Sequence, residues 1–115
     1  MQKPSPRLTE KEIHTAVVQA WGLMGTPGSL VATIPNARAF GQPGLTKGLP
    51  DLLVIRPDNG VAFLELKTHK GTLSKDQILV LELLEASGTV VEVTYGLDEA
   101  YRQLIEWGVV RPFNW

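Results

Sequence analysis

Two apolar runs joined by a short polar turn do most to limit what this chain can fold into. The runs, residues 51–56 and 61–67, flank the sequence PDNG, and each has the length of a β-strand. Proline, aspartate, asparagine and glycine in succession favour a tight turn, so the segment predicts a β-hairpin. Charged residues nevertheless occupy positions that a buried strand would fill with apolar ones, namely Asp51, Glu65 and Lys67.

The apolar residues of this hairpin also predict its register. If Leu53 pairs with Phe63, Asp51 lies opposite Glu65, with about 5 Å between the two Cβ atoms. A shift of one residue would send the two carboxylates to opposite faces of the sheet. Residues two apart in a strand share a face, so Lys67 lies on the same side as Glu65.

Three charges gathered in this way point to a metal-dependent hydrolytic site. Two adjacent carboxylates repel each other unless a cation shares the site, and Mg²⁺ and Mn²⁺ prefer carboxylate oxygens. Lys67 could orient or deprotonate the attacking water, or stabilise the charge that develops at phosphorus. Taken singly, Asp51 also fits a cap at the start of a strand, and Glu65 with Lys67 fits a solvent-facing edge. The combination favours a centre that hydrolyses a phosphodiester.

The rest of the chain predicts helices on the faces of a sheet. Two of the helices begin with capping boxes, Thr9 with Glu12 and Ser74 with Gln77. A glycine- and proline-rich stretch, residues 35–48, predicts a long loop before the hairpin. The predicted elements are helices over 9–24, 74–87 and 98–107, the last capped by Asp98, and strands over 30–34, 51–56, 61–67 and 89–95. Their order, α-β-β-β-α-β-α, indicates an α/β fold.

Length and composition limit the remaining possibilities. The chain of 115 residues suits one domain, over 9–115, after a flexible lead-in over 1–8. It has no cysteine, which excludes disulfides, thiolate metal sites and cysteine nucleophiles. No apolar run approaches the roughly 20 residues of a membrane helix, so we expect no membrane partner and a cytoplasmic location.

The charge is small overall but unevenly distributed. A net charge of −1 argues against indiscriminate binding of nucleic acid. Six basic and three acidic residues lie between positions 38 and 75, whereas five basic and nine acidic residues lie outside this stretch. The basic stretch therefore contains the unusual hairpin.

The charged hairpin resembles the PD-(D/E)xK nuclease signature, with Pro50-Asp51 followed by Glu65-Leu66-Lys67. Within that superfamily the chain is most similar to the virus-type replication-repair nuclease domain family, VRR-NUC, especially its short stand-alone members in phages. The shared motifs are GLPDL at 48–52, ELK at 65–67, GTLS at 71–74 followed by Gln77, PNA at 35–37, and Gly88 with VVEVTYGLDEA at 90–100. The resemblance implies a restriction-endonuclease-like core, in which helices flank a small mixed β-sheet.

The resemblance also implies a DNA endonuclease that depends on Mg²⁺ or Mn²⁺. Asp51, Glu65 and the backbone carbonyl of Leu66 would bind the metal. Lys67 would be the catalytic lysine, and Gln77 resembles a glutamine that the family has near the site. Glu12 is similar to an acidic residue that such nucleases often place near the metal from their first helix, but it fits the capping box equally well.

Basic residues that flank the charged hairpin are candidate phosphate contacts: Arg38, Lys47, Lys70 and Lys75. Each also fits an ordinary solvated side chain. Stand-alone members of the family are associated with homodimers and with branched DNA such as Holliday junctions, in replication, recombination or repair. A dimer would supply the second centre needed to cut two strands.

The resemblance places the protein in the bacterial cytoplasm, encoded by a phage or by the bacterium. Two alternatives stay open, namely a non-catalytic module that binds DNA or protein, and a hydrolase that acts on RNA or another phosphodiester.

Overall fold

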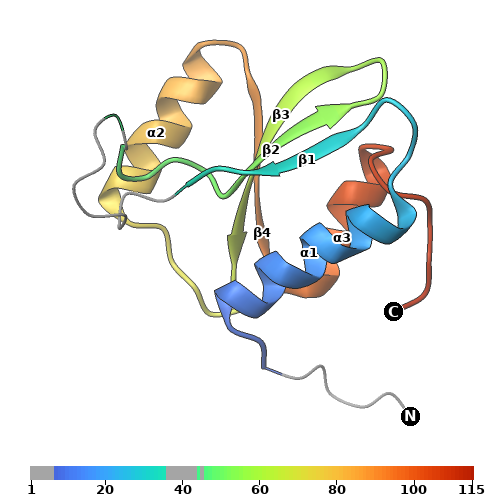
Figure 1. Ribbon diagram of the computed structural model, residues 1–115. Coiled ribbons are helices and arrows are strands. Elements are labelled where there is room, and N and C mark those ends of the chain that lie inside the picture. The colour runs from blue at the N-terminus through green and yellow to red at the C-terminus, as the bar shows by residue number, and fades with distance from the viewer. Residues whose placement is uncertain (1–6, 36–43, 45) are drawn as a thin grey trace.

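The computed structural model describes residues 7–35, 44 and 46–115, and its elements follow the predicted order α-β-β-β-α-β-α (Figure 1). They are α1 (Glu10–Met24), β1 (Leu30–Thr33), β2 (Leu52–Arg56), β3 (Gly60–Lys67), α2 (Lys75–Ala86), β4 (Val90–Tyr95) and α3 (Leu97–Glu106). Most of the expected lead-in and the middle of the expected loop, including Arg38, lie outside the described residues.

The four strands form one mixed sheet in the order β1-β2-β3-β4. The first three strands pair antiparallel, and β4 pairs parallel with β3 after the chain crosses over through α2. In the hairpin Leu53 pairs with Phe63 and Ile55 with Val61, which confirms the predicted register. The expected α/β fold with a mixed sheet flanked by helices is therefore confirmed.

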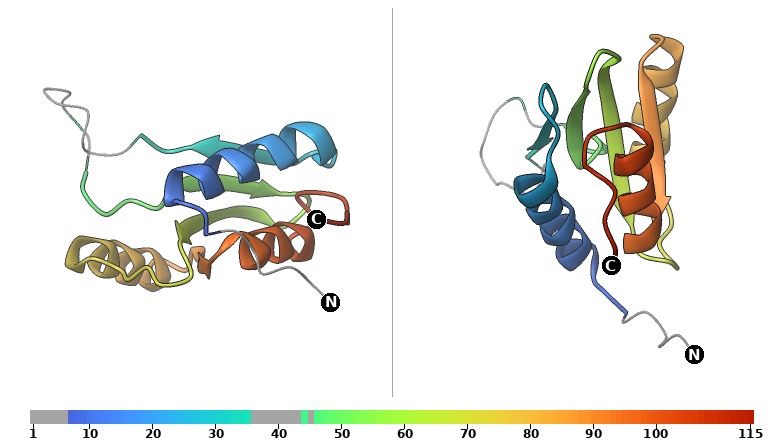
Figure 2. Two further views of the ribbon diagram at one scale, coloured as in Figure 1. Left: turned by 90° about the horizontal axis from the view of Figure 1, so that it is seen from below. Right: turned by 90° about the vertical axis from the view of Figure 1, so that its right-hand side faces the viewer.

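The helices divide between the two faces of the sheet. The ribbon views show α1 and α3 side by side on one face and α2 on the other (Figure 2). The core between the sheet and the helices α1 and α3 is built from Ile13, Val17, Val31, Leu52, Val54, Leu64, Leu66, Ala100, Leu104, Val109 and Val110. Because successive side chains of a strand alternate between faces, Leu64 and Leu66 enter this core, whereas Glu65 and Lys67 face the side of α2.

Both predicted capping boxes are present, but the predicted cap of the last helix is wrong. Gly96 occupies the N-cap position of α3 with φ 89°, and no side chain caps this helix. The cap lies two residues earlier than expected, at Gly96 rather than Asp98, because only Gly96 separates the helix from β4. Asp98 lies in the first turn, where its carboxylate accepts a hydrogen bond of 2.7 Å from Trp115 Nε1.

The helix α2 is only lightly packed, which the sequence did not predict. Leu81 is its one buried residue, whereas Ile78, one helical turn before it, and Leu83 are 44% and 62% exposed. Leu79 is 56% exposed as well. An apolar surface is therefore left open on this helix. Among the described helices, none has the length and apolar character needed to cross a membrane.

Candidate active site

Asp51 is fixed where β2 begins, between the strands on either side of it. Its backbone carbonyl accepts a hydrogen bond of 2.9 Å from the Ile34 N–H, just beyond β1. Its carboxylate oxygen Oδ2 accepts one of 2.7 Å from the Leu66 N–H of β3. Since these bonds tie down both the backbone and one carboxylate oxygen, the other oxygen is presented to the pocket beside β3.

Glu65 is the most strongly perturbed ionisable group of the site. It is only 2% exposed, and burial is the main reason that its pKa rises from 4.5 to about 8, followed by the charge and hydrogen bond of Asp51. Lys67 lowers this pKa, but by too little to offset the rise. The register of the hairpin thus puts two carboxylates side by side, and the positive charge of Lys67 does not offset the repulsion between them.

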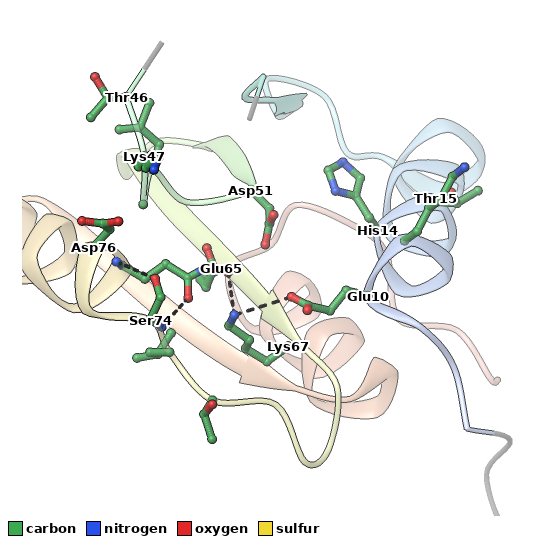
Figure 3. A pocket seen from close by; sticks show the side chains of 16 residues that line it. Glu10, His14, Thr15, Thr46, Lys47, Asp51, Glu65, Lys67, Ser74 and Asp76 are labelled. Carbon is green, nitrogen blue, oxygen red and sulfur yellow. Dashed lines mark hydrogen bonds and ion pairs between the residues drawn. The ribbon is translucent and has the colours of Figure 1, made fainter. Parts of the chain in front are cut away.

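Lys67 lies at the end of β3 with its side chain nearly buried at 8% exposure. Its Nζ is 3.8 Å from Glu65 Oε2 and 3.7 Å from Glu10 Oε1 of α1 (Figure 3). Gly71 packs against its aliphatic stem, because a Cβ there would be 3.2 Å from both Lys67 Cβ and Cδ. The ammonium group is therefore held between two carboxylates at the floor of the pocket.

Gln77 reaches the same carboxylate from the first turn of α2. Its Nε2 donates a hydrogen bond of 3.1 Å to Glu65 Oε2, the oxygen that also faces Lys67. Gln77 is at the same time the capping partner of Ser74. The sequence identified Gln77 for both roles, and the structure combines them in one side chain.

The acidic residue that α1 brings to the site is Glu10, which the sequence did not predict. Glu12, which fits the sequence pattern of either a metal ligand or a cap, accepts a hydrogen bond of 3.0 Å from the Thr9 N–H and completes the capping box. This bond is the main reason that the pKa of Glu12 is lowered. The signal for Glu10 was its spacing, three residues before buried Ile13 and seven before buried Val17, which places it near the helix face that meets the sheet.

Asp51, Glu65 and Lys67 line an open pocket with a volume of about 1010 Å³. One wall is the start of α1, with Glu10, Lys11, His14 and Thr15 (Figure 3). The opposite wall lies where the chain enters α2 and consists of Thr72, Leu73, Ser74, Asp76 and Gln77. Of the basic residues that the sequence nominated as phosphate contacts, Lys47 lines this pocket and Lys70 and Lys75 do not.

Two further residues of α1, Lys11 and His14, line the pocket, and the sequence did not predict them there. The Nε2 atom of His14 lies 2.9 Å from Thr33 Oγ1 at the end of β1. This hydrogen bond fixes the imidazole at the pocket wall. His69, two residues after Lys67, packs against Gly96, where a Cβ would be 2.3 Å from its ring.

The donor set of the site fits a hard divalent cation. In the described residues no three acidic or histidine side chains gather closely enough to hold a metal by themselves, so Asp51 and Glu65 form a pair. Mg²⁺ commonly takes one or two carboxylates and keeps several waters. The N–H and C=O of a strand residue point to the same side, and because the Leu66 N–H donates to Asp51, the Leu66 carbonyl also points to the side of β2.

Comparison with known proteins agrees with this geometry. The sequence model of the family described as "VRR-NUC domain" matches residues 5–98. A solved structure titled "VRR_NUC domain protein" has 22% sequence identity and a TM-score of 0.73, covering 94% of this chain and all of its own. Another, titled "VRR_NUC domain", has 24% identity and a TM-score of 0.63, covering 86% of this chain and 97% of its own. A search of curated proteins found no significant match.

Proposed function

The chain belongs to the VRR-NUC domain family, a nuclease-type family, and from this premise we propose that it is a metal-dependent DNA endonuclease. The observation that carries the proposal is the carboxylate pair, in which Glu65 is buried against Asp51 with its pKa raised to about 8. A structural carboxylate gains nothing from such a position, whereas a divalent cation would offset the repulsion between the two groups.

Under this proposal, Asp51, Glu65 and the Leu66 carbonyl hold Mg²⁺ or Mn²⁺. When bound, the ion would supply Lewis-acid stabilisation of the negative charge on the phosphodiester. Glu10 Oε1 lies 3.7 Å from Lys67 Nζ, so the lysine has a second carboxylate beside it in addition to Glu65. The partly buried hydrogen bonds that Asp51 accepts from the Leu66 N–H and that Glu65 accepts from Gln77 would keep the two carboxylates in place when the pocket is filled.

Lys67 and Gln77 have different roles in the proposed reaction. Hydrolysis adds water to phosphorus and breaks one P–O bond, so the site must orient the water and stabilise the extra negative charge. Lys67 ends at the pocket floor between two carboxylates and is placed to do both. Gln77 keeps the Glu65 carboxylate in one orientation through its amide N–H.

The walls of the pocket support DNA as the substrate. Lys11 and His14 on one side and Lys47 on the other line the pocket and can contact phosphate oxygens. The four carboxylates of the pocket (Glu10, Asp51, Glu65 and Asp76) outnumber its three lysines, so DNA would bind more tightly when a divalent cation is present. A preference for branched DNA, such as a Holliday junction, rests on the resemblance to stand-alone relatives, as does a location in the bacterial cytoplasm.

We also propose that the protein acts as a homodimer. The exposed apolar side chains of α2, Ile78, Leu79 and Leu83, form a surface that association could cover. A two-fold dimer would carry two active sites and so could cut both strands of a branched substrate.

The test is cleavage of labelled linear, flapped and four-way DNA by purified protein with Mg²⁺, with Mn²⁺ and with EDTA. We expect cleavage only with metal, and its loss in Asp51→Ala, Glu65→Ala and Lys67→Ala proteins that keep the wild-type circular dichroism spectrum. Lys75→Ala is the matched control, since Lys75 is a lysine outside the pocket.

Failure to cut any of these DNAs with either metal would refute the proposal. Cleavage of RNA alone would redirect it to an RNA substrate, and binding of DNA without cleavage would favour a non-catalytic module.

A further inference from the structure

The amide of Gln77 is held at both of its ends. The Nε2 group donates to Glu65 Oε2 at 3.1 Å, and the Oε1 atom accepts a hydrogen bond of 2.9 Å from the Ser74 N–H. The Gln77 N–H in turn donates to Ser74 Oγ at 3.1 Å. The capping box of α2 and the buried carboxylate of the site therefore form one hydrogen-bonded network.

This network selects which end of the amide faces the carboxylate. A glutamine amide has an acceptor end and a donor end of nearly the same shape. If the oxygen faced Glu65, the NH₂ group would face the Ser74 N–H, and two donors would meet without an acceptor between them. Because Ser74 engages the Gln77 oxygen, the NH₂ group is directed to Glu65.

A close backbone contact fixes the start of α2 beside Asp51. Gly48, three residues before Asp51, has φ 88°, and a Cβ on it would lie 2.4 Å from the carbonyl carbon and oxygen of Asp76 and 2.8 Å from the Gln77 nitrogen. This contact and the capping box matter because α2 buries only Leu81. Packing by itself gives the first turn of this helix little support.

The other capping box of the chain provides a contrast. Thr9 and Glu12 form the same pair of hydrogen bonds at the start of α1. Glu12 is exposed and does not line the pocket that holds Glu65. The same motif thus caps both helices, but only the capping box of α2 has a side chain, that of Gln77, that also contacts Glu65.

We propose that Ser74 is a positioning residue of the active site. Its hydroxyl and N–H hold the first turn of α2 and orient the Gln77 amide so that the NH₂ group binds Glu65 Oε2. Glu65 is then left with its other oxygen for the cation. This inference rests on the proposed nuclease function for its catalytic consequence, whereas the orientation of the amide can be measured without any activity.

The first measurement uses metal-free protein and NMR of the Gln77 side-chain NH₂ group, assigned through a Gln77→Glu variant that lacks the signal. In the wild type we expect two proton resonances that are shifted from the values of a free amide and exchange slowly with water. Ser74→Ala keeps the N–H but removes the hydroxyl that holds the first turn of α2, so it should move them toward the values of a free amide. Ser74→Thr, which keeps the capping hydroxyl, should preserve them. Ser87→Ala is the matched control, because Ser87 caps the opposite end of α2 through Leu84 O. If Ser74→Ala leaves the signals unchanged, the proposal is wrong.

The second measurement is steady-state cleavage of the DNA substrate that the wild type cuts. We expect Ser74→Ala to lower kcat by about tenfold with little change in KM, since misplacing a group at a reacting centre acts mainly on the chemical step. Ser74→Thr should restore most of the rate. Gln77→Glu keeps a capping-box side chain but lacks the NH₂ group, so it should keep the helix and lose activity.

Wild-type kcat in either Ser74→Ala or Gln77→Glu would overturn the inference. Wild-type protein that shows the expected NH₂ signals but cuts nothing would refute the nuclease proposal and leave the positioning role of Ser74 supported.

Discussion

The buried carboxylate of Glu65 should make the metal-free protein less stable as the pH rises. In the folded protein its pKa is about 8, against 4.5 for the ordinary group. Between these two values the folded state binds more protons than the unfolded state, so the free energy of unfolding falls as the pH rises through this window. Glu65→Gln removes the titrating group while keeping a side chain that can accept from Gln77 and donate to Asp51.

The magnitude follows from the difference in pKa. A difference of about 3.5 would correspond to a ceiling of about 5 kcal/mol at pH 8 and above. Water entering the open pocket will relax part of the cost of burying the charge, so we expect a gain on the order of 2 kcal/mol for Glu65→Gln at pH 8.5. At pH 4.5, where Glu65 is protonated in the folded state and about half protonated in the unfolded state, the two proteins should have nearly equal stability.

The assay is urea denaturation followed by tryptophan fluorescence, in EDTA, at pH 4.5 and at pH 8.5. Glu92→Gln serves as the control, because it makes the same substitution at an exposed glutamate of the neighbouring strand β4. Adding Mg²⁺ at pH 8.5 should raise the stability of the wild type and not that of Glu65→Gln. The reasoning fails if Glu65→Gln gains no more stability than Glu92→Gln between the two pH values.

Three further outcomes test the surroundings of the site. Gly48→Ala should destabilise the protein by about 2–4 kcal/mol, since it adds a steric clash to an unfavourable φ. Gly28→Ala, with a similar φ and open space around it, should cost only about 1 kcal/mol. Equal losses of the free energy of unfolding in urea would contradict this. Lys47→Ala should weaken DNA binding in a gel-shift titration with Ca²⁺ more than Lys75→Ala does, because only Lys47 lines the pocket; a larger effect of Lys75→Ala would place the DNA elsewhere. Leu83→Glu should shift sedimentation from dimer toward monomer, since it puts a charge on the exposed apolar surface of α2; an unchanged dimer would assign the interface to another surface.

Local patterns determined most of the fold. The two capping boxes mark helix starts that the structure confirms at Thr9 and Ser74, because these signals depend only on residues three apart. The hairpin register follows from apolar residues that must face one another, and with it came the juxtaposition of Asp51 and Glu65. The predicted trio of Asp51, Glu65 and Lys67 therefore needed no information from distant parts of the chain.

Local patterns were insufficient where a side chain has two local uses or where packing decides. Glu12 fitted a metal ligand and a cap equally well; in the structure it forms the capping box, and Glu10 is the carboxylate of α1 that lies near Lys67. Asp98 has the chemistry of a cap, yet the short connection from β4 puts the cap two residues earlier, at Gly96. Ile78 lies one helical turn before buried Leu81, yet it is 44% exposed, because packing and not spacing decides which side chains of α2 are covered.

The sequence by itself determined which residues could form a charged centre, since strand alternation and pairing act over neighbouring residues along one hairpin. Only the tertiary structure decided what surrounds that centre. The first turn of α2 brings Ser74 and Gln77 to Gly48 and Glu65. The start of α1, which packs on the other face of the sheet, brings Glu10 and His14 to the same pocket. The distances that matter here link residues far apart in the chain, and these are set by the packing of whole elements.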